Sequence, residues 1–272
     1  MKTGFLSRAR TEAGIALTII RTNIAAGMEL RAAFALQIVG MMLNNTAFVV
    51  VWVYFFQAFG TINGWSATET IGMQGFSAFM FGIAFTFAGG SSYLPNLVDN
   101  GSFDSVLLSP RNLYIRILTS KVTISALGDI AFGVVLMGMY LFLAHVSFLQ
   151  ACIFLSILPA AALVMINVTF ITALSAFVFP DASGFARNAF DVFFTPSMYP
   201  AALFQGALRF IFTFAIPSLV IAGIPIETIR DVRWQGVVLI WIMAFVWTFL
   251  AVKLLKIGLK KYESGNLTGA RI

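Results

Sequence analysis

The chain has 272 residues, of which 60% are hydrophobic and only 10% are charged. A soluble domain has about 25% charged residues, so this composition excludes an ordinary soluble protein and indicates that most of the chain is surrounded by lipid. A single cysteine excludes an internal disulfide framework, and a single histidine argues against a protein-ligated zinc site. The net charge of +6 would suit nucleic acid, but its placement along the chain argues for membrane orientation instead.

Residues 1–33 are expected to lie along a membrane surface. Within Phe5–Arg31, apolar side chains recur at helical spacing, while Arg10, Arg21 and Glu29 stay off that stripe. This pattern is typical of a helix in the headgroup plane, although an ordinary polar lead-in remains open. The apolar run is short and lacks a clear cleavage site, so we expect the segment to be retained rather than removed as a signal peptide.

The first two predicted spans carry polar and small residues. Phe34–Phe56 has no charge and exceeds the roughly 20 residues that a spanning helix needs. It contains Asn44 and Asn45, whose amides either bond to a neighbouring helix or line a pathway. Thr70–Gly90 is the second predicted span. One of its faces consists of small residues, which favours close packing against another helix. These small residues are Gly75, Ala78, Gly82, Thr86 and Gly89.

Asp129 lies inside the third predicted span, Val122–Leu143. An ionisable residue in a span is a functional candidate by default. The alternative is a structural role near the interface, with Lys121 or Arg116 as its partner. The fourth predicted span, Ala151–Phe179, has a partly polar inner stretch.

The region after the fourth span does not resemble simple spans. Its pieces between prolines are too short to cross a bilayer of about 30 Å, so we expect one span that starts near Phe185 and then a re-entrant hairpin over 200–226. Arg187 and Asp191 are four residues apart and could pair on one helical face. Trp234–Val252 is the last predicted span. The candidate pathway residues are Asn44, Asn45, Asp129, Asn167 and Asp191, and the two aspartates could attract a cationic compound.

The placement of basic residues gives an orientation. With six spans and both ends inside, only Arg209, Arg230 and Arg233 of the 17 Lys and Arg residues lie outside. This is the bias that the positive-inside rule requires, and it makes Ser91–Lys121 cytosolic. The predicted fold is therefore all-α and polytopic: one transmembrane domain over 1–272 with six transmembrane helices.

The sequence contains no Gly-x-x-x-x-Gly-Lys-Ser/Thr phosphate loop and no hydrolase or metalloprotease motif, so no enzymatic activity is expected of this chain. Few ionisable groups are available in the spans for a proton or sodium relay. We therefore expect the energy for any transport to come from a partner. The alternatives are an ion-coupled carrier or channel that acts without an ATPase, and a membrane scaffold that transports nothing.

The polar stretch 91–121 contains LPNLVDNGSFDSVLLSPR, which starts at Leu94. It resembles a pattern in one branch of the ABC-2-type permeases, the membrane subunits of ABC exporters. There the second span is followed by Leu-Pro, a helix that ends in Gly, an apolar-Asp pair, Leu-Leu and an Arg-Pro or similar dipeptide, in whose place this chain has Ser109-Pro110-Arg111. Tyr199-Pro200, Ile216-Pro217 and the basic tail also fit.

The resemblance implies an export permease in a prokaryotic inner membrane, with both termini cytoplasmic. The 29 Phe residues suit a small amphipathic substrate, although Phe side chains that face lipid give the same composition, and we expect a drug-like, lipid-like or peptide compound. The implied partners of the permease are two ATP-binding subunits, which would hold the ATP and Mg, and a second permease, identical or homologous. No cofactor would be bound by this chain, and no nucleic acid is implied. A cytosolic coupling helix in 91–121 would contact the ATPase, unless its apolar residues only rest on the lipid interface. The implied contact residues are Leu94, Pro95, Leu97, Asp99, Gly101, Phe103, Asp104, Leu107, Leu108 and Pro110.

Overall fold

The structure is a computed structural model that describes residues 5–108, 112–179 and 182–262. Within these ranges the regular elements are helical, apart from one isolated bridge between Ile62 and Trp65. Five helices in the described part of the chain are long and apolar enough to cross a membrane. They are α2 (Arg31–Phe59), α3 (Ala67–Phe87), α7 (Ala126–Leu143), α8 (Phe148–Ala173) and α13 (Trp234–Leu259). The prediction of an all-α polytopic membrane protein is confirmed.

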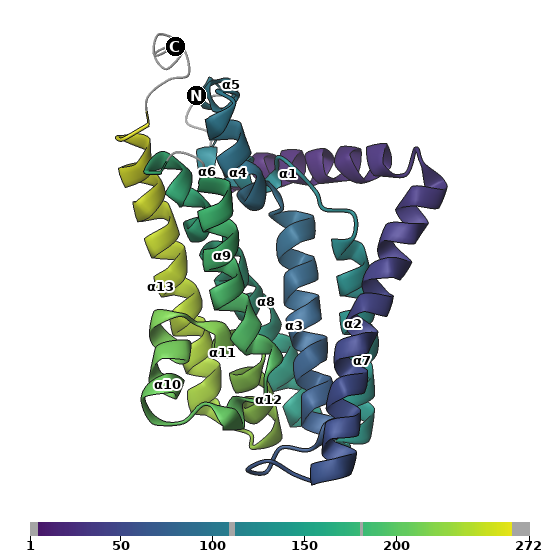
Figure 1. The fold of residues 1–272 in the computed structure, drawn as a ribbon. Coiled ribbons are helices and arrows are strands. Elements are labelled where there is room, and N and C mark those ends of the chain that lie inside the picture. The colour runs from purple at the N-terminus through teal and green to yellow at the C-terminus, as the bar shows by residue number, and fades with distance from the viewer. Residues whose placement is uncertain (1–4, 109–111, 180–181, 263–272) are drawn as a thin grey trace.

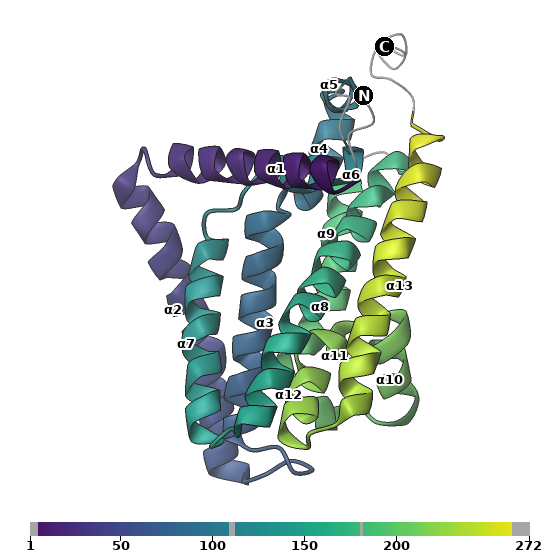
Figure 2. The same cartoon turned by 180° about the vertical axis from the view of Figure 1, so that it is seen from behind.

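The first helix, α1 (Phe5–Gly27), lies across one end of the bundle, nearly perpendicular to the long helices (Figures 1 and 2). This is the orientation expected of a helix in the headgroup plane. Asn23 ties it to the body by donating a hydrogen bond to the carbonyl of Ser120 at 3.5 Å. The chain then turns sharply into α2, whose most apolar stretch contains no buried residue. Helix α2 therefore stands on the outside of the bundle, against α7 and α3.

Helices α3 and α7 pack closely because glycines face each other's backbones. A Cβ atom on Gly82 would lie 2.6 Å from the backbone nitrogen of Ile130, and one on Gly133 would lie 2.6 Å from that of Phe79. The same holds for Gly75, whose Cβ would lie 2.8 Å from the nitrogen of Met137. The predicted small-residue face of the second span is thus the surface on which α7 rests.

Three short helices fill the interval between α3 and α7. They are α4 (Gly90–Asp99), α5 (Phe103–Leu107) and α6 (Leu113–Thr119). Figures 1 and 2 show them at the end of the bundle where α1 lies and where α13 finishes. We call 90–119 the coupling segment.

The region after α8 and its 3-10 extension η1 (Leu174–Phe177) consists of short helices. The predicted fifth span is α9 (Ala182–Phe194), which has 13 residues and continues into the 3-10 turn η2 (Thr195–Met198). Alone, α9 is too short to cross a bilayer. It fills the half of the bundle nearest the coupling segment, and the hairpin that follows fills the other half (Figure 1). The hairpin elements are η3 (Ala201–Leu203), α10 (Gly206–Phe210), the π-helical turn η4 (Ile211–Ala215), α11 (Ser218–Ile221) and α12 (Gly223–Arg230).

Candidate functional site

The coupling segment is anchored to the body by buried apolar side chains. Leu94 and Phe103 are fully buried in a cluster that also includes Phe177 and Leu255 from the η1 and α13 regions. The ring of Phe103 lies 5.3 Å from that of Phe177 and 5.0 Å from that of Tyr262. This corrects the expectation that Leu94 and Phe103 are knobs for another subunit, because both side chains are already covered by the chain itself.

An apolar tip remains exposed beyond that anchor. Leu107 is 39% exposed and Leu108 is 86% exposed. Between α4 and α5 the chain turns at Gly101, whose φ of +71° is in the left-handed region that favours glycine. This turn sets α5 beyond the end of α4, so the structure presents Leu107 and Leu108 outward at the end of the bundle.

The other predicted contact residues divide between anchor and surface. Pro95 is buried and Leu97 is half-buried against the same apolar cluster, whereas Asp99 is exposed. Asp104 accepts a hydrogen bond from the hydroxyl of Tyr262 at 2.9 Å, which joins α5 to the chain just beyond α13. Pro110 lies outside the described residues.

Asn167 is the centre of a buried network that joins three helices. Its side-chain oxygen accepts from the hydroxyl of Tyr114 in α6 at 2.5 Å. Its amide nitrogen donates to the carbonyl of Leu163 at 2.7 Å and to the hydroxyl of Thr248 in α13 at 2.9 Å. The residue is fully buried, and burial raises the pKa of Tyr114 to about 12. Asn167 was expected to line a pathway. Its hydrogen bonds are used within the protein instead, and we assign it a structural role.

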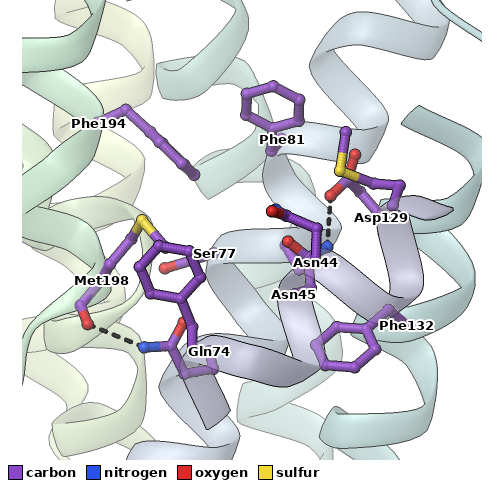
Figure 3. A pocket seen from close by; sticks show the side chains of 12 residues that line it. Asn44, Asn45, Gln74, Ser77, Phe81, Asp129, Phe132, Phe194 and Met198 are labelled. Carbon is purple, nitrogen blue, oxygen red and sulfur yellow. Dashed lines mark hydrogen bonds between the residues drawn. The ribbon is translucent and has the colours of Figure 1, made fainter. Parts of the chain in front are cut away.

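A cavity of about 230 Å³ opens between α2, α3, α7 and the α9–η2 region (Figure 3). We call it the Asp129 cavity. Asn45 donates a hydrogen bond to Oδ1 of Asp129 at 2.6 Å, and Gln74 donates to the carbonyl of Met198 at 2.9 Å. The lining residues are Met41, Asn44, Asn45, Phe48, Gln74, Ser77, Ala78, Phe81, Asp129, Phe132, Phe194 and Met198.

The partner of Asp129 differs from the basic residues that were expected. Lys121 lies 3.9 Å above the ring of Tyr93, and Arg116 donates to the carbonyl of Ser105 at 3.3 Å. Asn45 takes their place, because α2 packs directly against α7. Asn45 therefore bonds to a neighbouring helix, as the first of its two alternatives requires, and it also lines a cavity.

A second cavity of about 410 Å³ lies between α4, α8 and α9 and contains Arg187 and Asp191. Both side chains are exposed, and the ion pairs found among the described residues do not join them. Asp191 thus lies apart from the other predicted pathway residues. Phe81 lines both cavities and contacts Phe194 at a ring distance of 5.2 Å.

At the other end of the bundle, a charged pair joins the two arms of the hairpin. Arg209 of α10 donates to Glu227 of α12 at 3.3 and 2.5 Å, and Glu227 is buried. Nearby, the hydrogen bond from Arg230 lowers the pKa of Asp231 below its usual value.

A protein-family model described as ABC-2 family transporter protein matches residues 42–266. The match includes α3 through α13, and with them the coupling segment and nearly all of both cavity linings. No curated protein and no solved structure matches the chain.

Proposed function

The chain belongs to the ABC-2 family of transporter proteins, and from that premise we propose that it is the membrane-spanning permease subunit of an ATP-driven exporter. The sequence has no phosphate loop, so ATP and Mg would be held by a separate ATP-binding subunit. The complex would contain two such subunits and two permeases. The permeases would be either two copies of this chain or this chain with a similar one.

The observation that carries the proposal is the exposed apolar tip, Leu107 and Leu108, on a buried anchor. An exposed pair of leucines at a polar end of the bundle is suited to insertion in a groove of another protein. The anchor beneath it is rigid, because Phe103 and Leu94 are packed against η1 and α13. A push on the tip would therefore reach the membrane helices as a rigid-body displacement.

The distribution of charge supports a cytoplasmic location for this end in a prokaryotic inner membrane. Helix α1, the coupling segment, the start of α9 and the end of α13 gather there (Figures 1 and 2). The basic residues of these elements whose side chains the structure describes are Arg10, Arg21, Arg116, Arg187, Lys253, Lys256, Lys260 and Lys261. Arg209, Arg230 and Arg233 lie toward the opposite end. Under the positive-inside rule this distribution supports the proposal that the tip and both termini are cytoplasmic.

The cargo we propose is a small amphipathic molecule. The Asp129 cavity combines aromatic walls with a carboxylate and amides, which is the usual make-up of a site that holds an apolar body and orients a polar group. Drug-like, lipid-like and peptide compounds fit this description.

The experiment co-expresses the tagged chain with a candidate ATP-binding subunit that contains a phosphate loop, and it measures co-purification from the membrane. Leu108→Asp places a charge at the docking contact, so we expect at least a tenfold loss of the bound ATPase subunit, with unchanged membrane insertion. The matched control is Leu30→Asp, because Leu30 is 73% exposed at the corner between α1 and α2. Full co-purification of both Leu108→Asp and Leu107→Asp would remove the coupling segment as the docking site.

Reconstitution of the chain alone in liposomes tests the need for an ATPase. If a proton or sodium gradient drove transport there, the chain would be an ion-coupled carrier and the proposal would be replaced.

A further inference from the structure

We propose that the Asp129 cavity binds a primary ammonium group at the head of an apolar chain, as in a long-chain amine. This inference names a class of cargo for the proposed exporter. Only the role of the ligand as cargo rests on the proposed function. Binding itself is a property of this chain and is measured without an ATPase.

The first observation is an incomplete carboxylate. Asp129 is only 3% exposed, and its Oδ1 accepts the hydrogen bond from Asn45. Its Oδ2 is buried and has no hydrogen-bond donor among the described residues. Buried polar atoms nearly always have a partner, and a carboxylate oxygen without one is unfavourable. An occupant with N–H groups and a positive charge would donate the missing hydrogen bond to Oδ2 and would balance the negative charge of the carboxylate.

The missing donor distinguishes one kind of cation from another. A primary ammonium has three N–H groups and no acceptor, so one hydrogen can satisfy Oδ2 while another reaches an amide oxygen. Asn44 supplies an amide in the same cavity. A quaternary ammonium has no N–H and would leave Oδ2 without a hydrogen bond. The geometry therefore favours a primary amine over a permanently methylated cation.

The second observation is the apolar wall and its opening. Phe81, Phe132 and Phe194 line the cavity, and Phe48 and Asn44 lie at its rim on α2 with exposed side chains. The volume, about 230 Å³, is below the 300–1,000 Å³ of typical small-molecule pockets. The cavity thus fits a head group and the first carbons of a chain, and the rest of the chain would leave beside α2 into lipid.

The depth of Asp129 places it among the membrane helices. The residue lies in the first turn of α7, but its partner Asn45 is 14 residues beyond Arg31, where α2 begins. Fourteen residues of helix rise correspond to about 21 Å, so the carboxylate lies deep in the bundle rather than beside the head groups. An amine would reach it from the lipid beside α2, while its chain remains among the acyl chains.

The test measures the binding of dodecylammonium to the full chain in phosphatidylcholine nanodiscs. Phosphatidylcholine is chosen because it has no primary amine. Empty nanodiscs measure the partitioning of dodecylammonium into lipid, which is subtracted. We expect saturable binding at least tenfold tighter than that of dodecyltrimethylammonium or dodecanol, since about a factor of ten is the worth of one charge-assisted hydrogen bond. Asp129→Asn should weaken dodecylammonium binding by a similar factor.

Two further variants make the result decisive. Asp191→Asn removes a carboxylate from the second cavity and should leave binding within about twofold of the unaltered chain. Asn44→Leu keeps every charge and lies at the exposed rim of the Asp129 cavity, but it removes the amide that a second ammonium hydrogen would reach. It should also weaken binding about tenfold, and it decides the matter if Asp129→Asn fails to fold. The inference would be overturned by equal binding of the trimethyl compound, by wild-type binding to the folded Asp129→Asn variant or to Asn44→Leu, or by the absence of saturable binding. None of these outcomes would affect docking of an ATPase through Leu108.

Discussion

Tyr114 of α6 donates its hydroxyl hydrogen to Asn167 in the last third of α8, across 2.5 Å. Asn167 in turn donates to Thr248 of α13. The coupling segment is therefore tied by polar contacts to two membrane helices at once, in addition to its apolar anchor. Because Asn167 is fully buried, loss of any one partner leaves a polar group without a hydrogen bond in a site that water does not reach.

Tyr114→Phe is expected to lower the free energy of unfolding by about 1–3 kcal/mol, since it leaves the side-chain oxygen of Asn167 buried without a donor. The measurement is denaturant-induced unfolding of the purified chain in detergent. Tyr93→Phe is the control, because the ring that lies under Lys121 is kept and only a hydroxyl is removed. A loss of equal size in both variants would contradict the role assigned to the Asn167 network.

Alkaline pH should weaken the same contact. Burial raises the pKa of Tyr114 to about 12, above its value of 10.0 in the unfolded chain. The neutral hydroxyl thus contributes stability that is fully present below about pH 10 and is lost as the pH rises toward 12. Unfolding measured at pH 8 and at pH 11 should show a smaller fall in stability for Tyr114→Phe than for the unaltered chain. An identical fall would mean that Tyr114 does not titrate as its burial requires.

Gly133→Ala and Gly138→Ala compare two glycines of the same helix. A Cβ on Gly133 would press against the backbone of Phe79 in α3, and backbone cannot move aside as a flexible side chain can. We expect a loss of about 1–3 kcal/mol for this variant. At Gly138 nothing lies within 4 Å of the added methyl, so we expect a neutral or slightly stabilising change. The midpoint of thermal unfolding in detergent measures both, and equal midpoints would argue against close α3–α7 packing.

Arg209→Gln should destabilise the hairpin, because Glu227 is buried and would lose both of its hydrogen bonds from the guanidinium. Since Arg209 itself is partly exposed, we expect about 1–2 kcal/mol rather than the larger cost of a fully buried pair. A double-mutant cycle with Glu227→Gln isolates the pair. Arg233→Gln, at a more exposed bridge to Asp231, should cost under about 1 kcal/mol. Independent, additive effects of Arg209→Gln and Glu227→Gln would refute the coupling.

The long helices could be predicted from the sequence because their signal is local. The sequence predicts a first span over Phe34–Phe56, and α2 covers Arg31–Phe59. It predicts a second span over Thr70–Gly90, and α3 covers Ala67–Phe87. The spacing of Gly75 and Gly82 also identified the face that packs on α7. A run of uncharged residues and a repeat of small residues can both be recognised without knowing how the rest of the chain folds.

Pairings between distant residues could not be predicted in this way. Asp129 has basic residues close by in sequence, yet its partner is Asn45, 84 residues away. The sequence suggests a pathway role for Asn167, because its hydrogen-bond partner Tyr114 is 53 residues away and no local pattern indicates the pairing. Phe103 looked like a contact for another protein, although its neighbours in space come from η1 and the chain after α13. An apolar helical face indicates that something covers it, but not which surface does.

Phe81 lines two cavities at once. Its ring forms part of the wall of the Asp129 cavity and part of the wall of the cavity that contains Arg187 and Asp191. The two compartments therefore share one side chain of their linings, and a change in the position of this ring alters the shape of both.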